Sequence, residues 1–250
     1  MKQVPDFSIQ SKKVLVAGAA SGFGSAVSLM IDQIGGELIL LDRDQAGLQA
    51  LSSQLQERAP FGSHVCDVCD ETELADVFLN YSDTGVNGVI NCVGLFFVAA
   101  LADGPVSQFS SILNVNLTAA YSLTQQAMRV LCDGGRIIHF ASASSHVANI
   151  GYSAYSSSKA GLSQLIKVTA REAATRGITV NAIGPAMTQT ALTEDHLNDP
   201  VFRQSAEQMI PLGRLGEPSD VLGMVNLLLS DAGSFITGQT LYIDGGRTLC

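Results

Sequence analysis

The chain has 250 residues, a formal net charge of −9, and 46% hydrophobic against 15% charged residues. This length and composition predict a sizeable buried core in one large α/β domain or two small ones, and they exclude extensive disorder. The negative charge argues against a nucleic-acid partner and against an acidic membrane surface, because neither attracts such a protein.

Targeting signals and cysteine usage favour a reducing, cytoplasmic setting. The N-terminal segment MKQVPDFSIQSKK lacks the apolar run of a signal peptide, and no segment is apolar for long enough to span a membrane. The five cysteines are odd in number and irregularly spaced. Cys66 and Cys69 form a C-x-x-C that could be redox-active or half of a metal site, but no second ligand pair accompanies it. We therefore expect a structural role for both and no bound metal.

Short aliphatic runs alternate along the chain with longer amphipathic segments. Strands are predicted at 13–18, 37–42, 63–68, 86–94, 135–142, 178–185 and 239–246. Helices are predicted at 24–34, 46–58 and 160–177. Most of the strands are continuously apolar, as expected of strands covered by helices on both faces. This rhythm predicts one Rossmann-type α/β domain over residues 1–250, with a doubly wound parallel sheet of about seven strands flanked by helices.

One segment breaks this rhythm. Residues 186–212 form a long polar insertion between the sixth predicted strand and the last helix. Ligands of open α/β sheets bind beyond the carboxyl ends of the strands. Because the insertion leaves such an end, we expect it to be a substrate-binding lid.

A glycine-rich turn, AGAASGFG, follows the first predicted strand and precedes a helix. Gly18, Gly22 and Gly24 would let the chain turn tightly and let its backbone approach a pyrophosphate. The helix start offers free N–H groups to the same anion. Ser21 and Phe23 lie within the turn and are candidate contacts of the same dinucleotide cofactor.

Acidic residues end the next two predicted strands. The Asp42 carboxylate could accept hydrogen bonds from both adenosine ribose hydroxyls and would repel a 2′-phosphate, which favours NAD over NADP. The neighbouring Arg43 could offset that repulsion. Asp67, with Val68 beside it, is placed for the adenine edge, although the carboxylate could instead cap a helix.

Further motifs in chain order resemble the short-chain dehydrogenase/reductase family, in its oxidoreductase branch of this chain length. The glycine spacing matches T-G-x-x-x-G-x-G with Ala17 in place of threonine, and NCVG at 91–94 is similar to N-N-A-G. YSSSK at 155–159 matches Y-x-x-x-K, with Ser142 at the usual spacing before it. NAIGPAMTQT is similar to N-x-x-x-P-G-x-x-x-T, with Ala186 in place of glycine.

The resemblance implies a catalytic set of Asn116, Ser142, Tyr155 and Lys159. Tyr155 would act as general acid and base. An ammonium one helical turn away at Lys159 would favour its phenolate, as would a positively charged nicotinamide ring nearby. Ser142 would hold the substrate oxygen, Lys159 would also contact the nicotinamide ribose, and Asn116 would hold a water that relays protons.

The same resemblance extends the sets of binding residues. It adds to the cofactor contacts Asn91, Cys92, Val93, Gly94, Tyr155, Lys159, Pro185, Thr188 and Thr190. Candidate substrate contacts are Ser142, Ser144, His146 and Tyr155. His139, inside an apolar strand, is interpreted as a hydrogen-bonded core residue.

The predicted function is that of an NAD-dependent alcohol dehydrogenase or ketone reductase acting on a small-molecule substrate. A secondary alcohol, a polyol or sugar derivative, and a 3-hydroxyacyl thioester are the substrate classes considered, and the polar lid favours a small polar one. The alternatives are a non-catalytic dinucleotide redox sensor and an epimerase or lyase with bound NAD. The resemblance also implies a homotetramer or homodimer, with interfaces from helices near 105–131 and 152–176.

Overall fold

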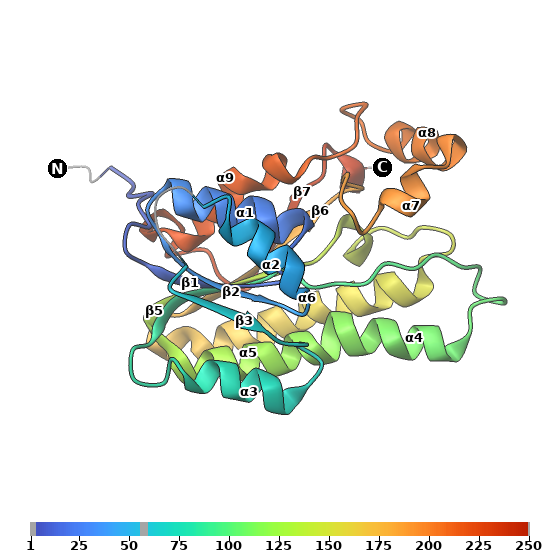
Figure 1. The fold of residues 1–250 in the computed structure, drawn as a ribbon. Coiled ribbons are helices and arrows are strands. Elements are labelled where there is room, and N and C mark those ends of the chain that lie inside the picture. Colours follow the sequence, from blue (N-terminus) through green and yellow to red (C-terminus); the bar gives the residue numbers. More distant parts are fainter. Residues whose placement is uncertain (1–3, 56–59, 250) are drawn as a thin grey trace.

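The computed structural model of the protein describes residues 4–55 and 60–249. Its centre is a seven-stranded parallel sheet in the order β3-β2-β1-β4-β5-β6-β7 (Figure 1). The strands are β1 Lys13–Ala17, β2 Glu37–Asp42, β3 Gly62–Val65, β4 Val86–Asn91, β5 Leu131–Phe140, β6 Thr179–Pro185 and β7 Thr240–Ile243. The predicted single-domain, doubly wound Rossmann-type fold is confirmed.

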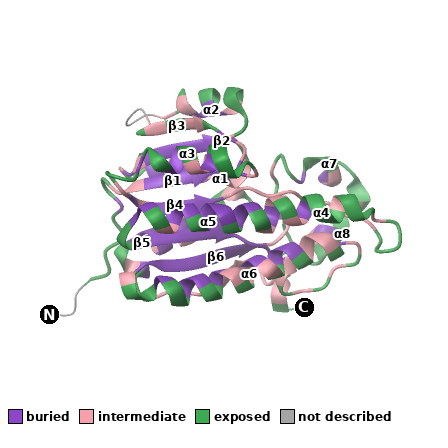
Figure 2. Ribbon diagram, turned by 90° about the horizontal axis from the view of Figure 1, so that it is seen from below, coloured by how far each residue is buried: buried purple, intermediate pink, exposed green. Residues whose placement is uncertain are grey.

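Helices cover both faces of the sheet, as Figure 1 shows. One face carries α3 Glu71–Leu79, α4 Val106–Leu113, α5 Ala119–Val130 and α6 Ser153–Ala173. The other face carries α1 Gly22–Gln33, α2 Gln45–Ser52 and α9 Leu222–Leu229. In Figure 2 the central strands are buried while the outer sides of the helices are exposed.

Alternate residues of β1 feed two separate cores. Leu15 and Ala17 pack with α3, α5 and α6, whereas Val14 and Val16 pack with α1, α2 and α9. Because both faces need apolar side chains, every residue of β1 after Lys13 is apolar. Two-sided burial therefore explains the continuously apolar runs in the sequence.

The strand order also places the site. β1 pairs with β2 on one side and with β4 on the other, so the sheet grows in opposite directions from β1. The loops that leave the carboxyl ends of β1 and β4 diverge at such a reversal and leave a crevice between them. The insertion at 186–212 lies near this edge and contains the short helices α7 Glu194–Leu197 and α8 Pro200–Gln208 (Figure 1).

Two predicted helix boundaries were wrong. α2 ends at Ser52 rather than at residue 58, because the hydroxyls of Ser52 and Ser53 donate to backbone carbonyls at Leu48 and Ala50. Such bonds compete with helix propagation. Residues 56–59 of the predicted helix lie outside the described residues.

α6 begins at Ser153, before the predicted start at residue 160. Serine and tyrosine are only slightly poorer helix formers than the residues that follow, and the first turns bury Ser158 and Lys159. Both Tyr155 and Lys159 therefore lie on a regular helix, one turn apart.

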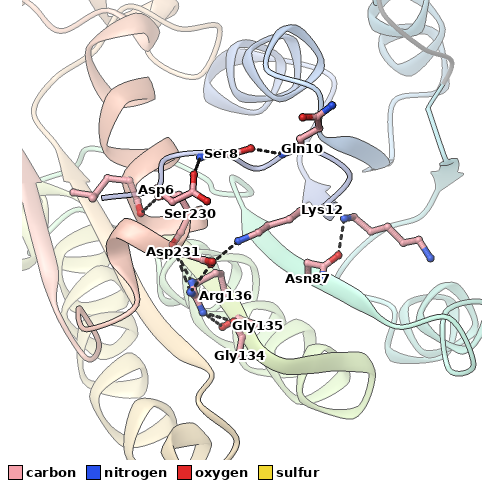
Figure 3. Close-up of polar contacts among 12 residues, drawn as sticks. Asp6, Ser8, Gln10, Lys12, Asn87, Gly134, Gly135, Arg136, Ser230 and Asp231 are labelled. Carbon is pink, nitrogen blue, oxygen red and sulfur yellow. Dashed lines mark hydrogen bonds and ion pairs between the residues drawn. The ribbon is translucent and has the colours of Figure 1, made fainter. Parts of the chain in front are cut away.

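A polar cluster closes the opposite, amino edge of the sheet (Figure 3). Arg136, at 5% exposure, donates to the backbone carbonyls of Gly135 and Ser230 and lies 3.6 Å from Asp231 Oδ1. The same carboxylate oxygen lies 2.8 Å from Lys12 Nζ. This carboxylate thus joins the segment before β1, the start of β5 and the end of α9.

We predict that Asp231→Ala lowers the free energy of unfolding by about 1–2 kcal/mol, because it leaves the buried Arg136 guanidinium without its counter-ion. Asp133→Ala is the matched control, since Asp133 pairs with Arg176 at the surface and should cost less than about 1 kcal/mol. Chemical denaturation measures both values. Equal losses for the two variants would contradict a special role of Asp231.

Candidate active site

Two adjoining cavities lie at the carboxyl edge of the sheet. The first, here called the glycine-loop groove, contains the loop after β1 and the ends of β2, β3 and β4. The second, the Tyr155 pocket, contains Ser142, Tyr155 and much of the 186–212 segment. Both are lined by Phe23, Thr190 and Leu192. A ligand longer than either cavity can therefore lie across both.

Most of the predicted cofactor residues lie in the groove. Those that line it are Gly18, Ser21, Gly22, Phe23, Asp42, Arg43, Asp67, Val68, Cys92, Val93, Gly94 and Thr190. Pro185, Thr188 and Tyr155 line the Tyr155 pocket instead, whereas Gly24, Asn91 and Lys159 line neither cavity.

The glycine loop has the form that a pyrophosphate needs. Gly18 and Gly22 have φ of 76° and 57°, values that favour glycine. At Gly24 an added Cβ would lie 1.9 Å from the Gly18 carbonyl oxygen, so only glycine lets α1 pack this closely against the loop. With Ser21 as N-cap, the first turn of α1 faces the groove. The residues present thus fit a dinucleotide.

Asp42 braces this loop and also borders the groove. Its Oδ2 accepts from Ala20 N at 2.9 Å, and its Oδ1 accepts from Asp44 N at 3.0 Å. Each carboxylate oxygen retains a second acceptor site, so the group can still accept from ribose hydroxyls. Asp67 accepts from Cys69 N through Oδ1, and Asp70 rather than Asp67 caps α3.

A row of buried hydrogen bonds holds the loop after β4. Asn91 accepts from Val93 N and donates through Nδ2 to His139 Nδ1 at 3.2 Å. His139 Nε2 in turn lies 3.0 Å from Thr124 Oγ1, and burial lowers the pKa of His139 to about 3. His139 is therefore a neutral, hydrogen-bonded core residue, as predicted.

Asn116 holds the same loop from its other side. It lies in the π-helical turn Asn114–Thr118 between α4 and α5, a distortion common at functional sites. Its side chain accepts from Leu95 N at 2.7 Å, and donates to Leu95 O and to Ser158 Oγ. A Cβ at Gly94 would lie 3.5 Å from both Asn116 Oδ1 and Lys159 Nζ, so Gly94 lies next to both side chains.

Tyr155 is partly buried, and it lines the same pocket as Ser142. Removal from water raises the pKa of Tyr155 to about 12, and the Ser142 side chain offsets part of this rise. Lys159 Nζ lies 5.8 Å from the centroid of the tyrosine ring. In the protein without a bound cofactor, removal from water is therefore the largest influence on the pKa of Tyr155.

Lys159 is buried. Its Nζ donates to Phe140 O at 2.7 Å, and burial lowers the pKa of Lys159 to about 8. One ammonium has three donors, so this bond fixes the amine at the end of β5 and leaves donor capacity for a ligand.

The Tyr155 pocket differs from the predicted substrate site. Ser144 lines it, but His146 does not; the exposed His146 ring lies against Tyr242, 5.7 Å between centroids. Residues that sequence reasoning missed are Phe96, Asn149, Tyr152, Met209 and Arg247. None belongs to a motif, and each enters the pocket through the tertiary fold.

The lid segment presents its apolar side to this pocket. Met187, Leu192, Met209 and Ile210 are among the residues that line it, whereas Glu194 and Asp195 are exposed and do not. The exposed acidic residues of the segment therefore do not describe its inner side, where Thr188, Thr190 and Thr193 line the pocket beside the apolar residues. A small polar substrate stays a prediction.

The C-x-x-C cysteines show no reactive environment. Cys66 and Cys69 are free thiols, and burial raises the pKa of both, that of Cys66 to about 12. The structure contains no cluster of three metal-ligating side chains within residues 4–55 and 60–249. No helix in the same described ranges is long and apolar enough to cross a membrane.

Comparison with known proteins identifies the family to which this fold belongs. The family described as enoyl-(acyl carrier protein) reductase matches residues 18–248. A structure of a short-chain type dehydrogenase/reductase from Mycobacterium marinum superposes with a TM-score of 0.87 at 30% identity, over 98% of each chain. The chain belongs to the short-chain dehydrogenase/reductase family.

Two relatives are similar to this chain over nearly its whole length. It is 33% identical over 244 residues to a 3-oxoacyl-[acyl-carrier-protein] reductase of Rickettsia prowazekii, covering 96% of this chain and 98% of that one. It is 34% identical over 264 residues to an uncharacterized oxidoreductase of Mycobacterium tuberculosis, covering 100% and 97%. This short-chain dehydrogenase/reductase is thus an oxidoreductase, and its family uses a nicotinamide cofactor.

Proposed function

We propose that the protein transfers a hydride between a secondary alcohol and NAD, with Tyr155 as general acid and base. One observation carries this proposal: the Tyr155 and Ser142 side chains both line the pocket that adjoins the glycine-loop groove. A substrate hydroxyl between these two groups would lie where the cofactor groove meets the substrate pocket.

The roles of the side chains follow from their chemistry. In the oxidising direction Tyr155, as phenolate, takes the hydroxyl proton of the alcohol while the hydride leaves the carbon that bears that hydroxyl. In the reverse direction the Tyr155 hydroxyl protonates the developing alkoxide. Ser142 hydrogen-bonds the substrate oxygen and holds it against the phenol. The nicotinamide, when bound, supplies the hydride acceptor.

Lys159 and Asn116 support that proton transfer. Lys159, fixed on Phe140 O, would contact the nicotinamide ribose with its remaining donors. A positive charge in this buried place, from the ammonium and from the oxidised nicotinamide together, would lower the pKa of the phenol. Asn116 would hold a proton-relaying water near Lys159.

Asp42 supports NAD over NADP, because a carboxylate at the adenosine ribose repels a 2′-phosphate. Arg43 lines the groove beside it and is exposed, so it is the residue that could counter this repulsion. Residues 186–212 would cover the substrate as a lid. We also expect a cytoplasmic homotetramer or homodimer.

The sensor and the epimerase or lyase are not favoured. A non-catalytic sensor needs no phenol and amine one turn apart on one helix face. Lys159 is buried, and burying an amine costs stability without a catalytic return.

We predict that Tyr155→Phe lowers turnover by at least two orders of magnitude and leaves dinucleotide affinity nearly unchanged, because only the proton-transferring oxygen is lost. A panel of secondary alcohols and ketones, followed through nicotinamide absorbance, measures turnover. The matched control is Tyr121→Phe, which removes an exposed hydroxyl on α5 and should retain full activity. A Tyr155→Phe enzyme that keeps most of its activity would rule out the proposed base.

We further predict that Asp42→Ala weakens NAD binding by about tenfold and narrows the ratio of NAD to NADP affinity, because the ribose loses its acceptor. Asp44→Ala, at an exposed neighbour outside the groove, should change neither value. Equilibrium binding of both cofactors separates two causes. Damage to the loop would weaken both cofactors equally, and an unchanged ratio would show that Asp42 does not select between them.

A further inference from the structure

One aromatic side chain joins the start of α6 to the lid segment. Phe96 lies two residues after Gly94, in the loop that leaves β4, and it lines the Tyr155 pocket. Its ring stands nearly perpendicular to three other rings, with centroid distances of 5.3 Å to Tyr152, 5.0 Å to Tyr155 and 5.1 Å to His196. Perpendicular ring contacts at these distances are favourable. Phe96 therefore connects α6, which contains the proposed base, with α7 of the lid.

The place of Phe96 against α6 is fixed from two sides. Asn116 binds both backbone polar groups of the preceding residue, since its side chain accepts from Leu95 N at 2.7 Å and donates to Leu95 O at 2.9 Å. Tyr152 and Tyr155 are three positions apart and lie on one face at the start of α6. Tyr152 is only 6% exposed, so it gives the Phe96 ring a buried neighbour beside Tyr155.

His196 belongs to a part of the lid that packs as one unit. Its ring lies 5.5 Å from the ring of Phe202, and the helices that contain them, α7 and α8, lie side by side (Figure 1). Phe202 in turn packs on a small apolar core made of Leu197, Ala206, Ile210 and Leu215. His196 itself lines neither the pocket nor the groove. Its contact with the site therefore runs through Phe96.

We propose that Phe96 is a positioning residue for Tyr155, and that the lid keeps it in place through His196. This inference rests on the proposed function for the role of Tyr155, and it adds the residues that link a covered pocket to an oriented phenol. The Phe96 ring limits the tilt of the Tyr155 ring and fills space beside it that water would otherwise enter. Proton transfer needs the phenol oxygen within hydrogen-bond reach of the substrate hydroxyl, so a tilted ring lowers turnover.

Loss of the Phe96 ring has two effects of opposite sign. Water then reaches the phenol and lowers its pKa, because removal from water is the largest influence that raises it. Loss of orientation nevertheless lowers turnover. A residue that only tuned ionisation would show the first effect without the second. The groups of α6 and its surroundings that also face Tyr155, which stay unchanged in Phe96 variants, are Ser142, Tyr152 and Lys159.

Ultraviolet difference titration of the cofactor-free protein tests the contact without substrate or turnover. Phe96→Ala is compared with the double variant Phe96→Ala/Tyr155→Phe, which isolates the signal of Tyr155. We expect this tyrosine to ionise about 1 pH unit lower than in the wild type, and Phe96→Leu, which keeps apolar volume, to shift it less. The matched control is Phe235→Ala, which removes a fully exposed ring before β7 and should titrate as the wild type.

Steady-state kinetics and equilibrium binding of NAD then test positioning. We expect Phe96→Ala to lower kcat about tenfold or more, Phe96→Leu to recover part of this loss, and NAD affinity to stay within about twofold. His196→Ala should lower kcat about threefold and shift the phenol titration in the same direction as Phe96→Ala. Asp195→Ala, at an exposed position of the same lid helix, should change neither value.

The outcomes separate the parts of the proposal. An unchanged titration, an unchanged kcat, or a loss of NAD affinity as large as the loss of kcat in Phe96→Ala would overturn the positioning role. A His196→Ala protein that behaves as Asp195→Ala would overturn the role of the lid. Activity that survives Tyr155→Phe would instead remove the proposed base, while the titration of Tyr155 would still report its contact with Phe96.

Discussion

The placement of two ionisable side chains on one face of α6, Lys159 buried and Tyr155 partly buried, is the constraint that organises this active site. Tyr155 and Lys159 are one helical turn apart, and removal from water favours the neutral form of each. Burial raises the pKa of the phenol to about 12 and lowers that of the amine to about 8. The protein alone thus holds its proton-transfer group protonated. Lowering the phenol pKa from about 12 to about 7 requires roughly 7 kcal/mol, which a bound cation must help to supply.

Hydrogen bonds from the surrounding strands and loops hold this pair of side chains in place. Lys159 is tied to the carbonyl that ends β5, and Asn116 fixes the loop after β4 through Leu95. The Asn91–His139 hydrogen bond joins β4 to β5 inside the core. These bonds connect the ends of neighbouring parallel strands, so the sheet sets the relative position of the cofactor groove and the substrate pocket.

Local patterns in the sequence account for the fold and for one half of the site. Apolar runs predict the strands because both sheet faces are covered, and the glycine turn is encoded by residues close in sequence. The substrate-binding half of the site is not encoded in such local patterns. Arg247, Asn149 and Met209 meet only because the C-terminal segment packs against α8, and no local period indicates that contact. His146 was predicted as a substrate contact, but it does not line the pocket, because its loop turns the ring toward Tyr242. The composition of the lid does not separate its exposed acidic residues, Glu194 and Asp195, from the threonines that line the pocket.

Ionisation of the Tyr155 phenol tests the account most directly. Ultraviolet difference titration of the wild type against Tyr155→Phe, with and without bound NAD⁺, isolates this one tyrosine. The account predicts no phenolate signal up to about pH 10 in the cofactor-free protein, because burial raises the pKa to about 12. It predicts ionisation at lower pH once NAD⁺ is bound. A phenol that ionises at the same pH in both states would contradict it.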